Sequence, residues 1–414
     1  MSRNPRGRRS QLNIINKKVL LIVGIAIIAL LCIFLMIKFM VAKKHNKDET
    51  STNPNLEILF EEINKEADKL KKQEDTNINI EIIGSIFCEE KLLNSVYNSE
   101  QDNYIFYRNF HKIIDKTSTA DLCIGVLETN FADSPYSSKG KHNAPTSLAE
   151  TLSLIGIDVL STATNYSFDY GIEGIISTKD ILEKHKIETV GTNRTPEEKD
   201  NILIKEINGI KLAFLSYTYG TNFEVSEEYK YSVNIINKNN MKEDIDKAKN
   251  NGADFIFLNL HCGSLKSSDA NDEQKDLVNY AIKCGVDVII GSHPIEIQNM
   301  EMRENSNQKN VFVAYAMGNF LSSDDYENAK IGLIVNIQIT KSSETDETYI
   351  SKITYTPSYI NYNKVMGSYE VLDVRKEVEK YEANDEDKVD ENIYKMLKEK
   401  LEMVDNKIGG NKWE

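Results

Sequence analysis

Cysteine, proline and tryptophan are scarce in this chain of 414 residues, which has 5 Cys, 7 Pro and 1 Trp. So few cysteines exclude a small fold built around a disulfide framework. One or two bridges remain open among the cysteines after residue 47, which are Cys88, Cys123, Cys262 and Cys284. The 40% hydrophobic content excludes global disorder and is enough for the packed core of one large domain or two modest ones.

Acidic residues are absent from the first 47 positions, where 10 Lys and Arg are found. Residues 48–414 carry a net charge of -24, because the 64 acidic residues of the chain face the 40 remaining basic ones. Neutralising phosphates requires a basic face. The composition of the main body therefore argues against a nucleic-acid partner.

The basic N-terminal segment surrounds a long apolar run. Residues 19–42 contain one charged residue, Lys38, and about 20 apolar residues suffice to cross the hydrocarbon core of a bilayer. A cleaved signal peptide is the alternative, but the run is longer than a typical signal-peptide core and no clear cleavage site follows it. Positive charge is denser before the run than after it. We therefore expect a cytoplasmic tail over residues 1–18, a single-pass anchor in the cell membrane over residues 19–42, and an extracellular main domain.

A linker with an amphipathic helix is expected over residues 43–75, because apolar residues recur there at helical spacing. Beyond it, β-branched runs alternate with helical segments, a pattern typical of βαβ units and a mainly parallel sheet. Strands are predicted at 78–83, 122–127, 157–160, 187–190, 255–260 and 286–290. Helices are predicted near 103–115, 147–155, 174–185, 240–250 and 272–284.

Antiparallel pairing is predicted in two places. Asn208-Gly209 lies between two apolar runs, which is a strong hairpin signal. Three later runs lack intervening helices and are expected to pair antiparallel; they lie at 311–316, 331–340 and 349–356. Together these patterns predict an α/β sandwich over residues 76–365 and a charged helical extension over residues 366–414.

Polar residues follow several of the predicted strands, where α/β folds bind their ligands. These residues are Glu128, Asn165, His261 and His293. Taken singly, each is as readily a turn former, a helix cap or a hydrogen-bonding histidine. Together, a carboxylate, an amide and two imidazoles suit one divalent metal such as Mn, Zn or Fe(II). Cys262 beside His261 is an alternative thiol nucleophile, although nothing in the sequence indicates a lowered pKa for it.

A family resemblance rests on a series of motifs in order along the chain. They are Ile83-Gly84-Ser85-Ile86, Leu127-Glu128-Thr129, Asn165 with Asp169-Tyr170-Gly171, His261-Cys262-Gly263, the run from Gly285 to Pro294, and Gly318-Asn319-Phe320. Over residues 82–323 the chain resembles the CapA, or PGA-cap, family of bacterial capsule and poly-γ-glutamate synthesis. The resemblance implies an αββα sandwich of the calcineurin-like metallophosphoesterase type, with metal ligands at Glu128, Asn165, His261 and His293.

Several positions depart from the pattern of that family. A ligand carboxylate is replaced by Ser85, a motif histidine by Tyr166, and a second histidine by Ile295. A two-metal phosphoesterase needs ligands on both sides of a bridging carboxylate, so we expect one metal at most, or none. Tyrosine has an intrinsic pKa of about 10 and is a poor general acid at neutral pH. The catalytic residues therefore stay unassigned.

Three functions are compatible with these observations. The first is a membrane-anchored protein of capsule or poly-γ-glutamate biosynthesis or export, whose partners are the membrane, the subunits of a synthase complex and the anionic polymer. The second is an extracytoplasmic hydrolase of phosphoester or amide bonds that uses one metal. The third is an inactive scaffold of a synthase complex.

Overall fold

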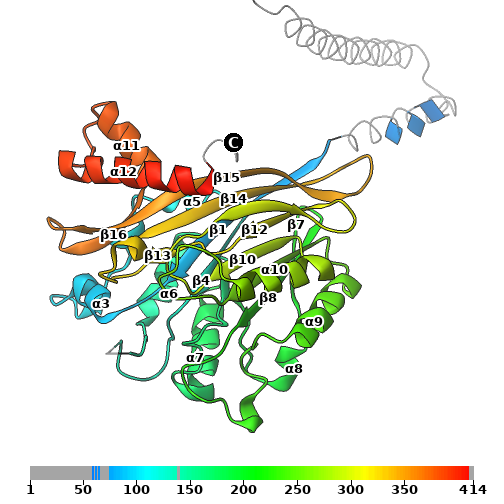
Figure 1. Cartoon of the computed structure of the whole chain (residues 1–414), viewed down its shortest axis with the longest axis horizontal. Coiled ribbons are helices and arrows are strands. Elements are labelled where there is room, and N and C mark those ends of the chain that lie inside the picture. The colour runs from blue at the N-terminus through cyan, green and yellow to red at the C-terminus, as the bar shows by residue number, and fades with distance from the viewer. Residues whose placement is uncertain (1–57, 60, 63, 66–73, 138–139, 410–414) are drawn as a thin grey trace, which may run out of the picture. The chain divides into compact units, whose positions relative to one another are not determined.

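The computed structural model describes residues 58–59, 61–62, 64–65, 74–137 and 140–409 (Figure 1). The chain divides into two compact units, Met1–Lys72 and Gln73–Glu414. In the first unit, the described residues of the predicted amphipathic helix are helical. The predicted cytoplasmic tail and membrane anchor lie outside the described residues. Within the described ones, no helix has the length and apolar character needed to cross a bilayer.

The second unit contains a mixed sheet of eight strands. The strand order of this sheet is β16-β15-β14-β1-β4-β5-β6, and β13 pairs with β1 off this path. β1 pairs in parallel with β4 and antiparallel with β14. The strands are β1 (Thr76–Ile86), β4 (Leu122–Leu127), β5 (Val159–Ser161), β6 (Glu188–Val190), β13 (Asn319–Leu321), β14 (Ile331–Lys341), β15 (Thr348–Asn363) and β16 (Ser368–Asp373).

The second sheet described has six strands in the order β11-β12-β10-β9-β8-β7. Its central strands β8, β9 and β10 run parallel to one another. The strands are β7 (Leu203–Ile207), β8 (Ile210–Thr218), β9 (Phe255–His261), β10 (Val288–Ser292), β11 (Met300–Glu304) and β12 (Asn310–Ala314). The predicted hairpin is confirmed: Asn208 and Gly209 both have positive φ and join the antiparallel strands β7 and β8.

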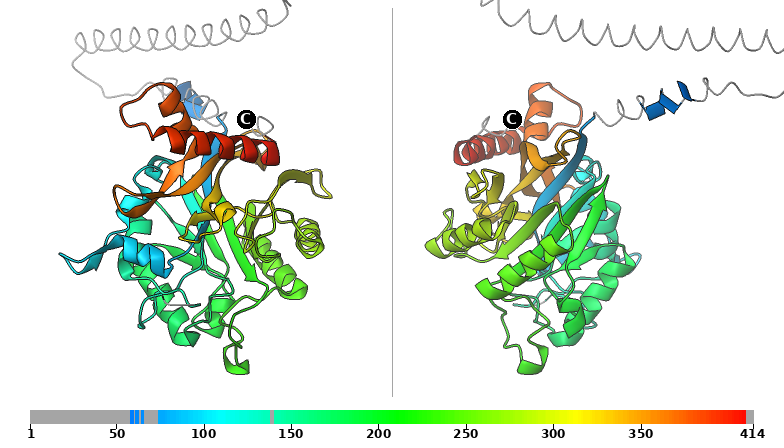
Figure 2. Two further views of the ribbon diagram at one scale, coloured as in Figure 1. Left: turned by 60° about the vertical axis from the view of Figure 1, so that its left-hand side comes forward. Right: turned by 90° about the vertical axis from the view of Figure 1, so that its right-hand side faces the viewer.

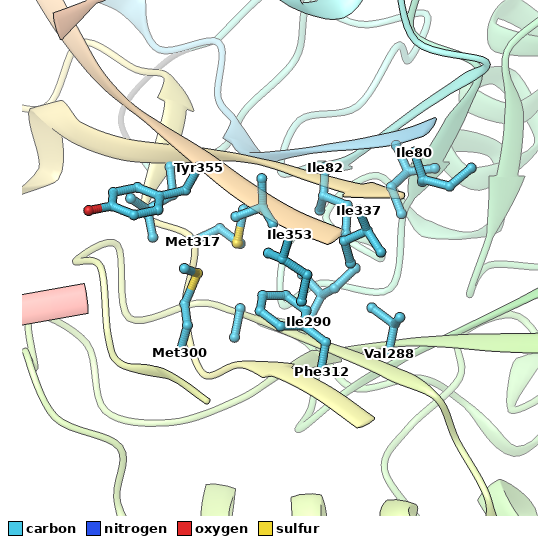
Figure 3. Packing of buried hydrophobic residues seen from close by; sticks show 14 of the residues in the cluster. Ile80, Ile82, Val288, Ile290, Met300, Phe312, Met317, Ile337, Ile353 and Tyr355 are labelled. Carbon is cyan, nitrogen blue, oxygen red and sulfur yellow. The ribbon is translucent and has the colours of Figure 1, made fainter. Parts of the chain in front are cut away.

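The two sheets pack face to face and helices cover their outer faces. Buried side chains from both sheets form a shared core, in which Ile82 of β1 and Ile290 of β10 lie together (Figure 3). On the outer face of the larger sheet lie α3 (Glu90–Val96), α4 (Tyr107–Phe110), α5 (Ile114–Thr117), α6 (Thr146–Leu154) and α7 (Gly171–Lys184). On the outer face of the smaller sheet lie α9 (Lys238–Asn250) and α10 (Asp272–Cys284). Figure 2 shows these helical layers on opposite sides of the strands, so the predicted αββα layering is present.

Some pairings differ from the prediction. β12 pairs in parallel with β10 and antiparallel with β11, and it lies in a different sheet from β14. The expectation that the run 311–316 pairs antiparallel with the later runs is therefore wrong. The helix predicted near 103–115 is broken into α4 and α5, and a small hairpin of β2 (Tyr97–Asn98) and β3 (Asn103–Tyr104) precedes them.

The segment 366–414 contributes a strand as well as helices. β16 pairs with β15, and α11 (Val374–Glu382) and α12 (Glu391–Ile408) follow it. Leu397 and Val404 of α12 are buried in the core cluster between the sheets. The Tyr355 hydroxyl donates to Asp405 at 2.6 Å, and Arg375 donates to the same carboxylate. The helices of this segment are therefore part of the packed domain.

Candidate functional site

The four residues predicted as metal ligands meet where the two sheets face each other. Glu128 follows β4 and Asn165 follows β5 in the larger sheet, while His261 ends β9 and His293 follows β10 in the smaller one. In each sheet the two strands are parallel neighbours, so their carboxyl ends lie at one edge. The layering brings these two edges together.

We call these four residues the polar half of the site, and His261 lies at its centre. Its Nε2 lies 2.9 Å from Oδ1 of Asn165 and 3.8 Å from Oε2 of Glu128. The ring of His293 lies across it, with centroids 5.0 Å apart. Two donors bound to one ion at about 2.1 Å are roughly 3–4 Å apart. The spacing of these atoms is therefore that of donors able to share one ion.

Burial sets the charge state of the polar half. Desolvation, opposed by a hydrogen bond from Ser85 and reinforced by the nearby Glu89, raises the pKa of Glu128 to about 8. Desolvation, followed by repulsion from His293, places the pKa of His261 well below its usual value. Oε1 of Glu128 is buried and has no hydrogen-bond partner among the described residues. An orphaned buried carboxylate oxygen is stabilised by a cation.

An apolar cluster occupies the other side of the site. Phe87, Ile295 and Ala329 are buried together, and Tyr166 and Tyr326 pack against them. Ile295 and Tyr166 are two of the positions at which the resemblance noted in the sequence implies histidines. The side chain of Ile295 offers no donor to a second metal. We call this cluster the apolar half of the site.

The loop after β10 carries backbone strain. His293 has a φ of 96° and Ile295 a φ of 58°, both in the region that side chains other than glycine rarely adopt. Such conformations persist when the surrounding structure enforces them, and they cluster at functional sites. One strained loop thus supplies a residue to each half of the site.

His142 is a further imidazole of the site that the sequence patterns did not indicate. It lies on the loop between β4 and α6, with its ring 4.5 Å from that of Tyr166. Burial lowers the pKa of His142 to about 4 and raises the pKa of Tyr166 to about 12. At neutral pH both groups are uncharged, and neither is matched to general acid work.

Ser292 and Asn222 are two supporting residues that sequence reasoning also missed. The Ser292 hydroxyl lies 2.9 Å from Nδ1 of His261. Asn222, on the loop after β8, accepts a hydrogen bond from Nδ2 of Asn165 at 3.0 Å. No motif in the sequence pointed to Asn222, because its role depends on how an exposed loop folds back.

The cysteines do not take part in the site. Cys88, Cys123, Cys262 and Cys284 are all free, so neither of the bridges left open by the sequence is formed among them. Burial raises the pKa of Cys262 to about 12. A thiol held protonated in this way is neither a nucleophile nor a soft metal ligand.

Most of the second unit of the chain matches a known protein family. Residues 79–324 match the family model described as bacterial capsule synthesis protein PGA_cap. The chain belongs to this family. Its relatives include the capsule biosynthesis protein CapA of Bacillus anthracis, 25% identical over 189 residues, and the PGA biosynthesis protein CapA of Bacillus subtilis (strain 168), 25% identical over 187 residues. The alignments cover 44% of this chain in both cases, and 44% and 47% of the two relatives, so the chain spans about half the length of either.

Solved structures with a similar path of the chain include two nucleotide or phosphoester enzymes. The NAD nucleotidase NadN of Haemophilus influenzae is 13% identical, with a TM-score of 0.43, over 80% of this chain and 61% of that one. The calcineurin-like phosphoesterase YfkN of Bacillus subtilis is 12% identical, with a TM-score of 0.42, over 69% of this chain and 91% of that one.

In this PGA_cap family member, the site opens into a cleft of about 700 Å³. Acidic side chains outnumber basic ones along its wall: Glu89, Glu90, Glu128, Asp324 and Asp325 face Lys91 and Lys266. Lys91 is itself paired with Asp325. The described wall of this cleft therefore has an excess of acidic side chains, which disfavours the approach of an anionic polymer.

No group of three or more His, Cys, Asp and Glu side chains that could hold a metal ion is found in the part of the chain that the structure describes. Glu128, His261 and His293 are therefore not arranged as a formed metal site of three such side chains. The part of the geometry that fits one ion is the spacing of Nε2 of His261 from Asn165 and Glu128, and the apolar half offers no comparable set of donors.

Proposed function

We propose that this PGA_cap family protein is a membrane-anchored, extracytoplasmic component of capsule or poly-γ-glutamate biosynthesis or export, and that it binds one divalent metal. The names of the two CapA relatives support the process. The basic tail and apolar run that precede the acidic body support the placement outside the cell. The contrast between the polar and apolar halves of the site supports the single metal.

The observation that carries the metal proposal is the convergence of four donors from both sheets. Glu128, Asn165, His261 and His293 would hold the ion. The buried, unpartnered Oε1 of Glu128 provides a site for its charge. A divalent ion held there supplies Lewis-acid chemistry toward a phosphate or carboxyl oxygen. The protein contributes a fixed amide, two uncharged imidazoles and an apolar wall at Ile295.

Metal content of the purified full chain is the first test. After dialysis with Mn²⁺ or Zn²⁺, we expect about one ion per chain by elemental analysis. The variant His261→Gln should lose that ion, and the matched variant His185→Gln, at the end of α7, should keep it. Two ions per chain would contradict the one-metal reading, and none with either metal would overturn the metal proposal.

An inactive scaffold is a second candidate, favoured by the hydrogen bonding of His261. Both of its ring nitrogens already have protein partners, Asn165 and Ser292. A scaffold needs no metal, so polymer production by cells that depend on this chain should be unchanged by His261→Gln. Under the first proposal, production should fall with metal content across a series that includes Asn165→Ala.

Hydrolysis is tested on the same protein. The metal-loaded chain is assayed with p-nitrophenyl phosphate and with poly-γ-glutamate. Turnover that disappears in both His261→Gln and His293→Gln would assign a hydrolase, whereas metal binding without turnover of either substrate would leave a binding role in the biosynthetic process.

A further inference from the structure

A hydrogen-bonded series of three amide and carboxylate side chains leads away from the site. Nδ2 of Asn165 donates to Oδ1 of Asn222 at 3.0 Å, and Nδ2 of Asn222 donates to Oδ1 of Asp169 at 3.0 Å. At the inner end, Oδ1 of Asn165 accepts from Nε2 of His261 at 2.9 Å. Each amide in this series therefore directs its nitrogen toward Asp169 and its oxygen toward His261.

The carboxylate at the outer end fixes this direction. An ionised carboxylate only accepts hydrogen bonds, so Asn222 must turn its NH₂ toward Asp169 and its oxygen toward Asn165. Asn165 must then turn its NH₂ toward Asn222 and its oxygen inward. Burial raises the pKa of Asp169 only to about 6, with Asn222 and Lys141 opposing the rise, so the group is ionised at pH 8.

Further hydrogen bonds fix the positions of the three residues in this series. The backbone N–H of Asn222 donates to the carbonyl oxygen of Asn165 at 2.8 Å. Lys141 donates to the carbonyl oxygen of Asp169 at 2.9 Å. Asp169 and Asn165 are buried, so water does not freely replace either partner. The second hydrogen-bond partner of the His261 ring, the Ser292 hydroxyl, both donates and accepts and so cannot set the direction.

We propose that Asp169 and Asn222 are positioning residues that orient the Asn165 amide, so that its oxygen and not its NH₂ faces the ligand site. Neither residue touches the site itself. Asparagine binds a cation through its oxygen, and an NH₂ in the same place would repel it. The consequence for metal affinity rests on the proposed function, whereas the orientation of the amide does not.

The test compares three variants with the wild type at pH 8. Asp169→Asn is nearly isosteric but lets the Asn222 amide point either way. Asn222→Ala removes the middle side chain of the hydrogen-bonded series, at an exposed position. The double variant Asp169→Asn with Asn222→Asp restores an acceptor-only group beside Asn165, and the new amide at position 169 then donates to that group. A role in shape alone predicts no such rescue.

The first readout needs no metal. Nitrogen-15 NMR of histidine-labelled, metal-free chain reports the tautomer of His261, assigned with His261→Gln. We expect a proton on Nε2 in the wild type, a mixture of Nε2–H and Nδ1–H forms in Asp169→Asn and Asn222→Ala, and a return to Nε2–H in the double variant. An unchanged tautomer in the single variants, or a mixture in the double one, would overturn the proposal.

The second readout is the dissociation constant for Mn²⁺. Loss of an outer-shell partner weakens metal binding by roughly 10–100-fold, and we expect about 10-fold weaker binding in Asp169→Asn with recovery in the double variant. Wild-type affinity in both single variants would overturn the positioning role. Absence of binding by the wild type would instead refute the metal proposal, with the tautomer experiment still deciding the orientation of Asn165. If Asp169→Asn fails to fold, Asn222→Ala decides both readouts.

Discussion

The Nε2 of His261 and the Oδ1 of Asn165 lie 2.9 Å apart, although 96 positions separate the two residues in the chain. One residue ends a strand of the smaller sheet and the other follows a strand of the larger sheet. The polar half therefore exists only where the two sheets are packed, and binding at the site is coupled to the packing of the sandwich.

This coupling predicts that metal stabilises the folded chain. A ligand that binds only the native state at 100 times its dissociation constant adds about 2.7 kcal/mol to the free energy of unfolding. We expect that increase with Mn²⁺ relative to EDTA, measured by urea denaturation. The gain should vanish in His261→Gln and persist in His185→Gln. Equal stabilisation of both variants would mean that the metal binds elsewhere.

The apolar half makes a separate prediction at Ile295, which is buried with a φ of 58°. Truncation of a buried isoleucine to alanine costs about 2–5 kcal/mol. Glycine is usually worse than alanine by up to about 1 kcal/mol, but a left-handed conformation costs a residue with a Cβ about 1–2 kcal/mol. We therefore expect Ile295→Gly to be the more stable of the two.

The measurement is the free energy of unfolding of both variants in EDTA. If Ile295→Ala is more stable than Ile295→Gly, the prediction is wrong and glycine does not release backbone strain at this position. The metal content of both variants should stay near that of the wild type, because Ile295 belongs to the apolar half. Loss of the metal in both would show that the two halves are not independent.

Much of the fold was predictable because its buried strands are continuous apolar runs. β4 was predicted at its observed bounds, and all six of its residues are buried. Apolar runs carry no information about which strand they pair with, so the parallel pairing of β12 with β10 could not be predicted. β13 has three residues, too few for a periodic pattern, and its pairing with β1 joins distant parts of the sequence.

For the site, the sequence could predict which residues lie close together where each residue is tied to a strand end, whereas their role as metal ligands stays a prediction. Glu128, Asn165, His261 and His293 all follow this rule, and parallel neighbours bring their ends together. His142 and Asn222 lie on loops, whose paths are set by tertiary contacts and not by local periodicity. The absence of histidines at positions 166 and 295 was visible in the sequence, but the apolar cluster that Tyr166 and Ile295 form with Phe87 and Ala329 required the structure.

The free cysteines give a prediction about reactivity. Cys88, Cys123 and Cys262 are buried, whereas Cys284 at the end of α10 is partly exposed. With its pKa raised to about 12, Cys262 is thiolate in about one molecule in ten thousand at pH 8. Among these four, iodoacetamide should modify Cys284 first, as followed by peptide mass spectrometry. Rapid modification of Cys262 in the folded chain would reopen its role as a nucleophile.

Glu81 gives a pH-dependent prediction outside the site. It is buried on β1, and Nδ2 of Asn336 donates to it at 2.8 Å. Desolvation, opposed by that hydrogen bond and by Lys116, raises its pKa from 4.5 to about 7. Below pH 4.5 the folded and unfolded states both bind the proton, and the raised pKa has no effect on stability. As the pH rises through 4.5 to 7, the unfolded state releases the proton first, so the folded state loses stability.

Above pH 7 the loss is complete and amounts to about 3 kcal/mol at 1.36 kcal/mol per pKa unit. Glu81→Gln removes the titration, and its amide can still accept from Asn336. The variant should therefore gain stability over the wild type as the pH rises, by about 3 kcal/mol between pH 4.5 and pH 8, measured by urea denaturation. Glu150→Gln, at an exposed position of α6, should show no such trend. A difference between Glu81→Gln and wild type that does not change with pH would mean that the pKa of Glu81 is not raised in the folded chain.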